Sequence, residues 1–318
     1  MQRVYEHIPV LIEETLEHLQ LRSGDHCIDC TVGGGGHARA MLTRTSPSGV
    51  LLGIDIDPQA VAASGAELRS FGQRATIVQA NYRDIKRIVA QQPFILPVNA
   101  IVLDLGLSTD QLNQERGFSF HDSGALGMRF DGDGGRTASE ILLYASVQEL
   151  ARIFRTYGEL PSAHALAKAI VASRADITEH GGTKPVVSVP KFVKLIERIV
   201  RSRRKTLHPA TLVFQALRIA VNDELENLSA FLPEAVGVLA TGGRIAVISY
   251  HSLEDRIVKS FFKRESRDCI CPPRTPVCRC GHMATVKVVT THAIKSSEKE
   301  QSVNPRARSA LLRVAEKI

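Results

Sequence analysis

The sequence predicts an α/β protein, in which a doubly wound, mostly parallel sheet is interrupted by an inserted all-helical subdomain. Short apolar runs alternate with helix-like segments up to residue 104, and this alternation resumes after residue 213. Between them, residues 109–212 show helical periodicity and glycine-rich turns without strand alternation. We therefore assign 1–108 and 213–318 to the sheet domain, and 109–212 to the insertion.

The first half of the sheet domain begins with a helix that ends near Leu19. Four apolar runs then predict parallel strands, and each is followed by a helix-like or loop segment. Asp57 suits a helix N-cap and Pro58 the first turn, so that helix is expected to reach about Phe71. The four strands are expected to end near Ile28, Ile54, Gln79 and Leu103.

The insertion and the second half follow the same periodicity rules. Helices are expected at 150–157, 163–175 and 189–203, and loops at 132–135 and 181–185. A single helix is predicted over 214–231. A turn at Gly242 and Gly243 then leads into a strand at 244–249, and 286–290 and 309–314 are expected to pair as the last two strands. A fifth strand closed by such a pair is the layout of class I methyltransferases, not of a second mononucleotide-binding half.

A glycine loop follows the first strand. Glycine has no Cβ, so the backbone can turn sharply there and lie against a ligand, and the next helix offers unpaired N–H groups. About 20 residues on, a strand ends in Asp55, whose carboxylate can bind ribose hydroxyls. The loop consists of Gly33, Gly34, Gly35 and Gly36, followed by His37.

The glycines alone leave the ligand open. Gly33, Gly35 and Ala38 satisfy the dinucleotide pattern G-x-G-x-x-G/A. Asp29, Gly33 and Gly35 also fit the D-x-G-x-G-x-G pattern of S-adenosylmethionine enzymes, from which Thr31 departs. A glycine-rich turn without a ligand is the third interpretation. We expect an adenosine-containing cofactor.

Charge separates the two parts of the chain. Residues 1–100 hold 9 Lys and Arg against 10 Asp and Glu, which leaves 31 against 23 for the remainder. Such surpluses favour phosphate binding, although a solvated helix face gives the same pattern. One dense run includes Arg198, Arg201, Arg203, Arg204 and Lys205, and a second includes Arg256, Lys259, Lys263, Arg264 and Arg267.

The ends of the chain and its hydropathy bear on location. The first residues carry no apolar signal core, and no stretch approaches the roughly 18 apolar residues of a membrane span. We expect a cytoplasmic protein.

Seven motifs, in order along nearly the whole chain, resemble the bacterial 16S rRNA cytosine-N4 methyltransferase family of the MraW type. They are DLGLSTDQL (104–112), ERGFSF (115–120), MRFD (128–131), HPAT (208–211), FQALRI (214–219), SYHSLED (249–255) and NPRAR (304–308). The resemblance implies S-adenosylmethionine-dependent methylation of one decoding-centre cytidine in 16S rRNA, within the small ribosomal subunit. It also implies that the cofactor is held by the glycine loop with His37, Asp55, Tyr82, Asp104 and Gln111.

The chemistry implied by this resemblance assigns further residues. A cytosine N4 amine is a poor nucleophile, so the protein must align it with the methyl group and offer oxygen acceptors to its hydrogens. We expect Asp104 or a nearby carbonyl to accept a hydrogen bond from the amine, and Tyr250 or Phe118 to stack on the base. Ser249 and His251 are candidates for accepting a proton or contacting the substrate, with a structural histidine as the alternative. Arg201, Arg203, Arg204 and Lys205 are expected to contact RNA.

The six cysteines give a weaker pattern. Cys27 and Cys30 are expected to be buried apolar residues. The other four form C-x-C pairs, 269–271 and 278–280, whereas structural zinc sites favour C-x₂₋₄-C. We therefore expect an exposed loop or hairpin and assign no metal, with a four-thiolate zinc site as the alternative.

Two rival functions stay open. A nicotinamide-dependent oxidoreductase would need a second nucleotide-binding half, and a non-catalytic RNA-binding or assembly factor would bind the cofactor without methyl transfer. The oligomeric state is also open, with a homodimer among the alternatives.

Overall fold

The computed structural model describes residues 9–107, 116–131, 134–181, 184–201, 208–273, 275 and 277–318. The chain divides into two units. The sheet unit comprises residues up to Gly106 and from Leu225 onward, and the insertion unit runs from Leu107 to Glu224. The insertion therefore extends 12 residues beyond the boundary expected at residue 212.

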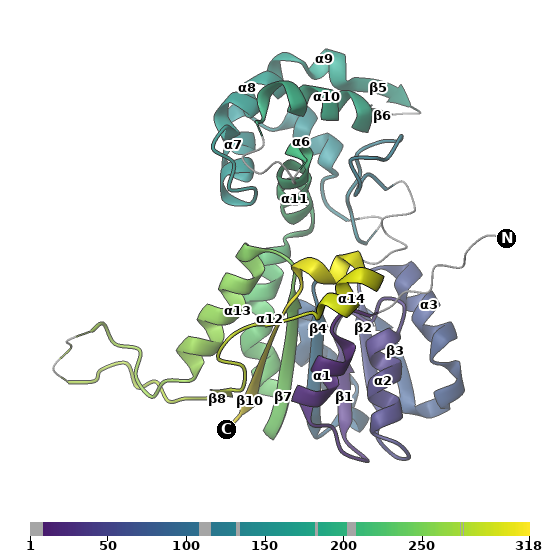
Figure 1. The fold of residues 1–318 in the computed structure, drawn as a ribbon, viewed down its shortest axis with the longest axis vertical. Coiled ribbons are helices and arrows are strands. Elements are labelled where there is room, and N and C mark those ends of the chain that lie inside the picture. Colours follow the sequence, from purple (N-terminus) through teal and green to yellow (C-terminus); the bar gives the residue numbers. More distant parts are fainter. Residues whose placement is uncertain are drawn as a thin grey trace. The chain divides into compact units, whose positions relative to one another are not determined.

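The sheet unit is built on one eight-stranded sheet with helices on both faces (Figure 1). The strand order is β3-β2-β1-β4-β7-β10-β8, with β9 also paired to β10. Pairs from β3 to β7 are parallel, whereas β10 runs antiparallel to β7, β8 and β9. The strands are β1 (His26–Asp29), β2 (Leu51–Asp55), β3 (Ala75–Gln79), β4 (Val98–Asp104), β7 (Leu239–Ser249), β8 (Val286–Val288), β9 (Ile294–Lys295) and β10 (Leu311–Lys317).

The helices of this unit fill the connections between strands. Asp57 caps α3 by accepting a hydrogen bond from the Gln59 N–H, with Pro58 at the first position, as the sequence predicts. The α-helices are α1 (Ile12–Leu19), α2 (Gly36–Arg44), α3 (Pro58–Glu67), α4 (Ile85–Gln91), α12 (Glu224–Val238), α13 (Ser252–Glu265) and α14 (Glu298–Val303). The 3₁₀ helices are η1 (Arg69–Arg74), η2 (Tyr82–Asp84), η3 (Pro93–Ile95) and η4 (Pro305–Ser309).

Alternating side chains of the central strands divide the core into two layers. In β4, Ile101 and Leu103 face the layer that contains α4, α12 and α13. Ala100 and Val102 face the opposite layer, which contains α1 and α2. Because successive strand residues point to opposite faces, a strand covered on both sides must be apolar throughout. This is why β4 appears in the sequence as a continuous apolar run.

The insertion unit has its own apolar core, which includes Phe154, Phe192 and Leu217. The expectation of an all-helical insertion was wrong, because β5 and β6 form an antiparallel hairpin. The segment 181–185, expected as a loop, includes residues of both strands. Its elements are α6 (Ala138–Tyr144), α7 (Val147–Thr156), α8 (Ala163–Ala172), α9 (Arg174–Ile177), β5 (Thr178–Gly181), β6 (Lys184–Val187), α10 (Val189–Ile199) and α11 (Pro209–Asn222).

The single helix predicted over 214–231 was also wrong. The chain breaks at Asp223, whose φ of 49° lies in the left-handed region, so α11 and α12 are separate helices. No helix in the described parts of the chain has the length and apolarity needed to cross a membrane.

Candidate functional site: the carboxyl ends of the parallel strands

The loop after β1 turns where the sequence places its glycines. Gly33 and Gly35 have φ values of 50° and 86°, a region that glycine adopts without strain. A Cβ on Gly36 would lie 2.2 Å from the Pro9 Cγ, so no other residue fits there. A Cβ on Gly34 would meet nothing within 4 Å, so this part of the loop faces open space. The loop can therefore receive a ligand closely at Gly34.

Asp55 at the end of β2 connects to this loop. Its Oδ2 accepts a hydrogen bond from the Gly33 N–H at 2.9 Å, and its Oδ1 accepts one from the Asp57 N–H at 2.9 Å. Burial raises the pKa of Asp55, while these N–H donors act in the opposite direction. The two hydrogen bonds fix the direction of the carboxylate beside the glycine loop.

Asp104 at the end of β4 is held from several directions. Its Oδ1 accepts from the Gly106 N–H at 3.1 Å, and its Oδ2 lies 4.0 Å from His37 Nδ1. The Tyr250 hydroxyl donates a hydrogen bond to the same carboxylate. Burial, followed by the negative charge of Asp104, raises the Tyr250 pKa well above its usual value, so the phenol stays protonated. Tyr250 is therefore a donor that orients Asp104.

The ring of Tyr250 lies close to the backbone that follows β4. A Cβ on Gly106 would lie 2.9 Å from two ring carbons, so the glycine makes room for the ring. The Tyr250 N–H donates to Glu254 Oε2 at 2.8 Å, and the positive charge of Arg306 acts on the phenol. Sequence reasoning did not identify Glu254 and Arg306 as neighbours of the site, although Glu254 lies in the motif SYHSLED and Arg306 in the motif NPRAR.

The sequence also did not predict the structural contacts of two polar residues where β1 meets its loop, Thr31 and Asp29. Thr31, which departs from the glycine pattern, accepts a hydrogen bond from the Asp104 N–H on its Oγ1 at 2.8 Å. It thereby ties the β1 loop to the end of β4. Asp29 is 1% exposed and accepts from the Thr31 N–H at 3.2 Å. Burial raises its pKa to about 7, and the charges of Asp104 and Asp55 add to the shift.

Ser249 and His251, predicted as proton acceptors, are engaged elsewhere. The buried Ser249 hydroxyl donates to the Leu311 carbonyl of β10 at 3.3 Å. His251 caps α13: its Nδ1 accepts from the Glu254 N–H at 3.4 Å, and the Glu254 carboxylate accepts from the His251 N–H at 3.3 Å. His251 Nε2 also lies 3.0 Å from Glu254 Oε1. Each side chain therefore has a polar contact close by, as expected for the structural alternative weighed for His251, and proton acceptance by either residue stays a prediction.

The aromatic candidates differ in their surroundings. Tyr82 lies in η2, after β3, with its ring edge-on to Phe231 at a centroid distance of 5.2 Å. Phe118 is 7% exposed in the insertion core and stacks on Phe130 at 5.4 Å. Its ring is therefore used in packing rather than offered to a base, which leaves Tyr250 as the stacking candidate of the pair. Gln111 lies outside the described residues.

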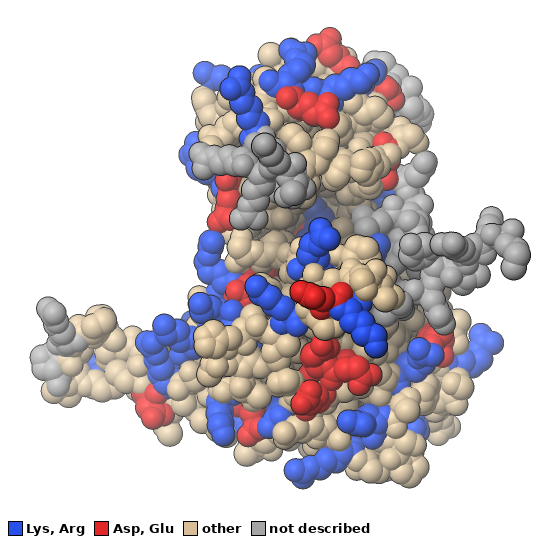
Figure 2. Space-filling model, in the orientation of Figure 1, with Lys and Arg blue, Asp and Glu red and all other residues tan. Residues whose placement is uncertain are grey.

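The basic candidates are only partly described. Arg201 is exposed just beyond the end of α10, whereas Arg203, Arg204 and Lys205 lie outside the described residues. In the sheet unit, five exposed basic side chains lie on α13 and just after it, and Figure 2 shows blue side chains gathered over this region. They are Arg256, Lys259, Lys263, Arg264 and Arg267.

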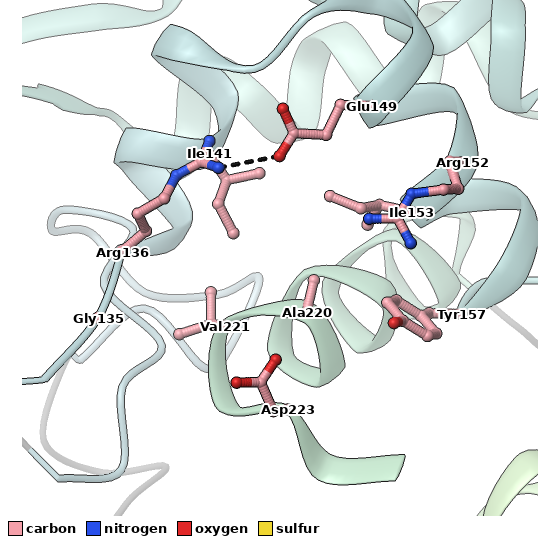
Figure 3. A pocket seen from close by; sticks show the side chains of 10 residues that line it. All are labelled: Gly135, Arg136, Ile141, Glu149, Arg152, Ile153, Tyr157, Ala220, Val221 and Asp223. Carbon is pink, nitrogen blue, oxygen red and sulfur yellow. Dashed lines mark hydrogen bonds and ion pairs between the residues drawn. The ribbon is translucent and has the colours of Figure 1, made fainter. Parts of the chain in front are cut away.

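A pocket of about 260 Å³ lies wholly within the insertion unit (Figure 3). Its walls come from α6, α7 and α11, and Arg136 forms an ion pair with Glu149 at 2.9 Å on one side. Arg152 and Asp223 also line it. None of the sequence-predicted site residues is among its lining residues. The strand-end site is therefore the better candidate for chemistry, because it combines the glycine loop with Asp55 and Asp104.

Comparison with known proteins finds relatives over nearly the full length of the chain. A 48% identical protein of Thermomicrobium roseum, named "Ribosomal RNA small subunit methyltransferase H", matches over 98% of this chain and 94% of its own length. A protein of the same name from Heliobacterium modesticaldum is 46% identical over 99% of both chains. The crystal structure of a putative rRNA-methylase from Clostridium thermocellum aligns over 98% of this chain and all of its own, with 14% identity and a TM-score of 0.45.

A sequence profile of the MraW methylase family matches residues 4–318, which includes every strand and helix described above. Together with full-length identities above 40%, this shows that the chain belongs to the MraW methylase family, whose class I methyltransferase fold the sheet order displays.

Proposed function

We propose that the protein transfers a methyl group from S-adenosylmethionine to the exocyclic N4 of one cytidine in the decoding centre of 16S rRNA, cytosine 1402 in the family's naming. The observation that carries the proposal is the Asp104–Tyr250 pair beside the glycine loop at the strand ends. The names of the relatives support small-subunit rRNA as the substrate. The proposed setting is the cytoplasm, with rRNA assembled in the small subunit.

The residues present fit the proposed cofactor. The open face at Gly34 and the N–H groups of the loop leading into α2 would receive its amino-acid end, and Asp55 would bind the ribose hydroxyls. Tyr82, after β3, would contact the adenine, and His37 and Gln111 would complete the site. When bound, the cofactor supplies a methyl group on a positively charged sulfur, so the reaction needs no metal.

The residues at the strand ends would act on the cytosine amine. As the N4–C bond forms and the C–S bond breaks, N4 must lose one proton. We assign the Asp104 carboxylate as the acceptor of this proton. Hydrogen bonds from N4 to its oxygens would concentrate electron density on the nitrogen, and one of these oxygens would then take the proton. The Tyr250 hydroxyl and the Gly106 N–H hold Asp104 in one orientation. We assign Ser249 and His251 to support of this region rather than to proton transfer.

The RNA would bind through positive charge on both units. Arg201 at the end of α10, with Arg203, Arg204 and Lys205 beyond it, would bind phosphates from the insertion, and the α13 cluster would do so from the sheet unit. The Tyr250 ring would stack on the target base, a contact that tolerates any base identity, so specificity for cytosine would come from Asp104.

The test uses tritiated S-adenosylmethionine, purified protein, and small ribosomal subunits that lack the modification, followed by nucleoside digestion. Label on N4-methylcytidine is expected. Asp104→Asn should lower kcat at least about 100-fold, as expected for loss of a general base. Asp84→Asn, which changes an exposed carboxylate, should match the unchanged protein. Label on another nucleoside would refute the N4 assignment. Tight cofactor binding with no label on subunits or free rRNA would favour an assembly factor, and absence of cofactor binding would reopen the nicotinamide alternative.

A further inference from the structure

The four cysteines that follow α13 come together in space. The Sγ atoms of Cys269, Cys271, Cys278 and Cys280 all lie within 4.8 Å of one another. The Cys278 and Cys280 sulfurs are 3.5 Å apart, and those of Cys280 and Cys269 are 3.8 Å apart. These separations exceed the roughly 2.05 Å of a disulfide bond, and all four thiols are free. Four sulfurs around a zinc ion at about 2.3 Å would lie roughly 3.8 Å apart by tetrahedral geometry.

Backbone hydrogen bonds hold the two C-x-C pairs against each other. The N–H of Ile270, between Cys269 and Cys271, donates to the Cys280 Sγ at 3.4 Å. The N–H of Arg279, between Cys278 and Cys280, donates to the Cys271 Sγ at 3.4 Å. Each pair therefore donates to a sulfur of the other. N–H donors of this kind favour thiolates, the form in which cysteine binds a metal.

The charge of the cluster also favours a cation. Four thiolates whose sulfurs lie this close together would repel one another, and a divalent ion among them would neutralise two of the four negative charges.

The long loop that carries the cysteines lacks an apolar core of its own. It extends away from the sheet between α13 and β8 (Figure 1). Among its described residues, no apolar side chain between Phe262 and Val286 is buried, and Val277 is 69% exposed. A segment of this length needs another source of order, and a metal ion is the usual one in small motifs. The convergent sulfurs are a group in the loop that could bind such an ion.

We propose that Cys269, Cys271, Cys278 and Cys280 bind one zinc ion that folds the loop between α13 and β8. This reverses the assignment of no metal, which rested on C-x-C spacing, because the reciprocal N–H···S bonds show how two such short pairs face one another. Zn²⁺ suits four thiolates, which exclude hard cations such as Mg²⁺ and Ca²⁺. The site lies apart from the strand-end residues, so its role is to order the loop and not to take part in methyl transfer.

The test measures metal directly in the full-length protein, purified under reducing conditions. Mass spectrometry of the metal content is expected to give about one zinc per chain. The double variant Cys278→Ser/Cys280→Ser should hold less than about a tenth of that. The control Val277→Ser alters an exposed side chain in the same loop, keeps every sulfur and should retain the zinc.

Two further measurements separate a zinc site from other uses of the thiols. Metal-free protein titrated with Co²⁺ should develop the intense visible bands of tetrahedral thiolate coordination, which the double variant should lack. Trypsin should cut near Arg267 and Arg279 at least about tenfold faster in metal-free protein, since metal binding and loop folding are coupled. Equal zinc in the double variant, no zinc uptake by reduced protein at micromolar concentrations, or disulfides among the four cysteines would each overturn the proposal.

Discussion

Replacement of Asp55 by Asn separates its two assigned roles. Both carboxylate oxygens accept from backbone N–H groups at 2.9 Å, one of Gly33 and one of Asp57. An Asn side chain has a single oxygen, so one of these donors would face an NH₂ group. We expect a loss of about 1–3 kcal/mol in the free energy of unfolding, the usual cost of an unsatisfied buried donor.

The same substitution should weaken cofactor binding beyond this effect. A hydrogen bond from a ribose hydroxyl to a charged acceptor contributes about 1.5–3 kcal/mol, which corresponds to a Kd about 10- to 150-fold higher. Calorimetric titration with S-adenosylhomocysteine gives the Kd, and urea unfolding gives the stability. Asp84→Asn, which removes the charge of a carboxylate in a solvent-exposed ion pair with Arg87 at 3.1 Å, is the matched control. A Kd for Asp55→Asn within threefold of the unchanged protein, at the reduced stability, would refute the ribose role.

Three further changes test neighbouring contacts. Tyr250→Phe, which keeps the ring, should lower kcat about 10-fold with the RNA KM unchanged, whereas Tyr250→Ala should also raise the KM; equal kinetics for Tyr250→Phe and the unchanged protein would remove the hydroxyl from the mechanism. Asp29→Asn mimics the protonated acid. The pKa of Asp29 is raised to about 7 in the folded protein from 3.8, so its protonation contributes fully to the free energy of unfolding below pH 4, and this contribution is lost as the pH rises through 7. The free energy of unfolding of the variant, measured in urea, should therefore rise relative to that of the unchanged protein by up to about 4 kcal/mol between pH 4 and pH 8. A pH-independent difference would contradict this. Thr31→Val should lower the free energy of unfolding by about 1–3 kcal/mol by leaving the Asp104 N–H unpaired, while Thr31→Ser, which keeps the hydroxyl, should cost less; equal losses would contradict the assigned hydrogen bond.

The sheet domain was predictable because its signals are local. Asp57 and Pro58 mark the start of α3. The strands of the parallel sheet are apolar on both faces, so each can be recognised in the sequence as an apolar run without knowledge of the strands it pairs with. The insertion hairpin was missed because β5 and β6 have four residues each, too few for alternation to emerge. The break at Asp223 was missed because the left-handed turn occurs at an aspartate, which is compatible with a continuing helix in sequence.

The candidate site was predictable by residue type more than by orientation. Position at a strand end placed Asp55 and Asp104 correctly near the glycine loop, since strand ends meet at one edge of a parallel sheet. Position could not say which way a side chain turns. His251 turns back to cap α13, and Ser249 donates to β10, because each finds a backbone partner close by. These contacts depend on the pairing of β7 with β10, which no local pattern contains.

The contact between Gly106 and the Tyr250 ring carries an evolutionary constraint. A Cβ at position 106 would lie 2.9 Å from ring carbons, so a side chain there and an aromatic ring at 250 exclude each other. The two positions should therefore change together across descendants of a common ancestor: lineages that lose the ring are free to replace the glycine, and lineages that keep it are not. Positions 106 and 250, more than 140 residues apart in the chain, would then covary in evolution.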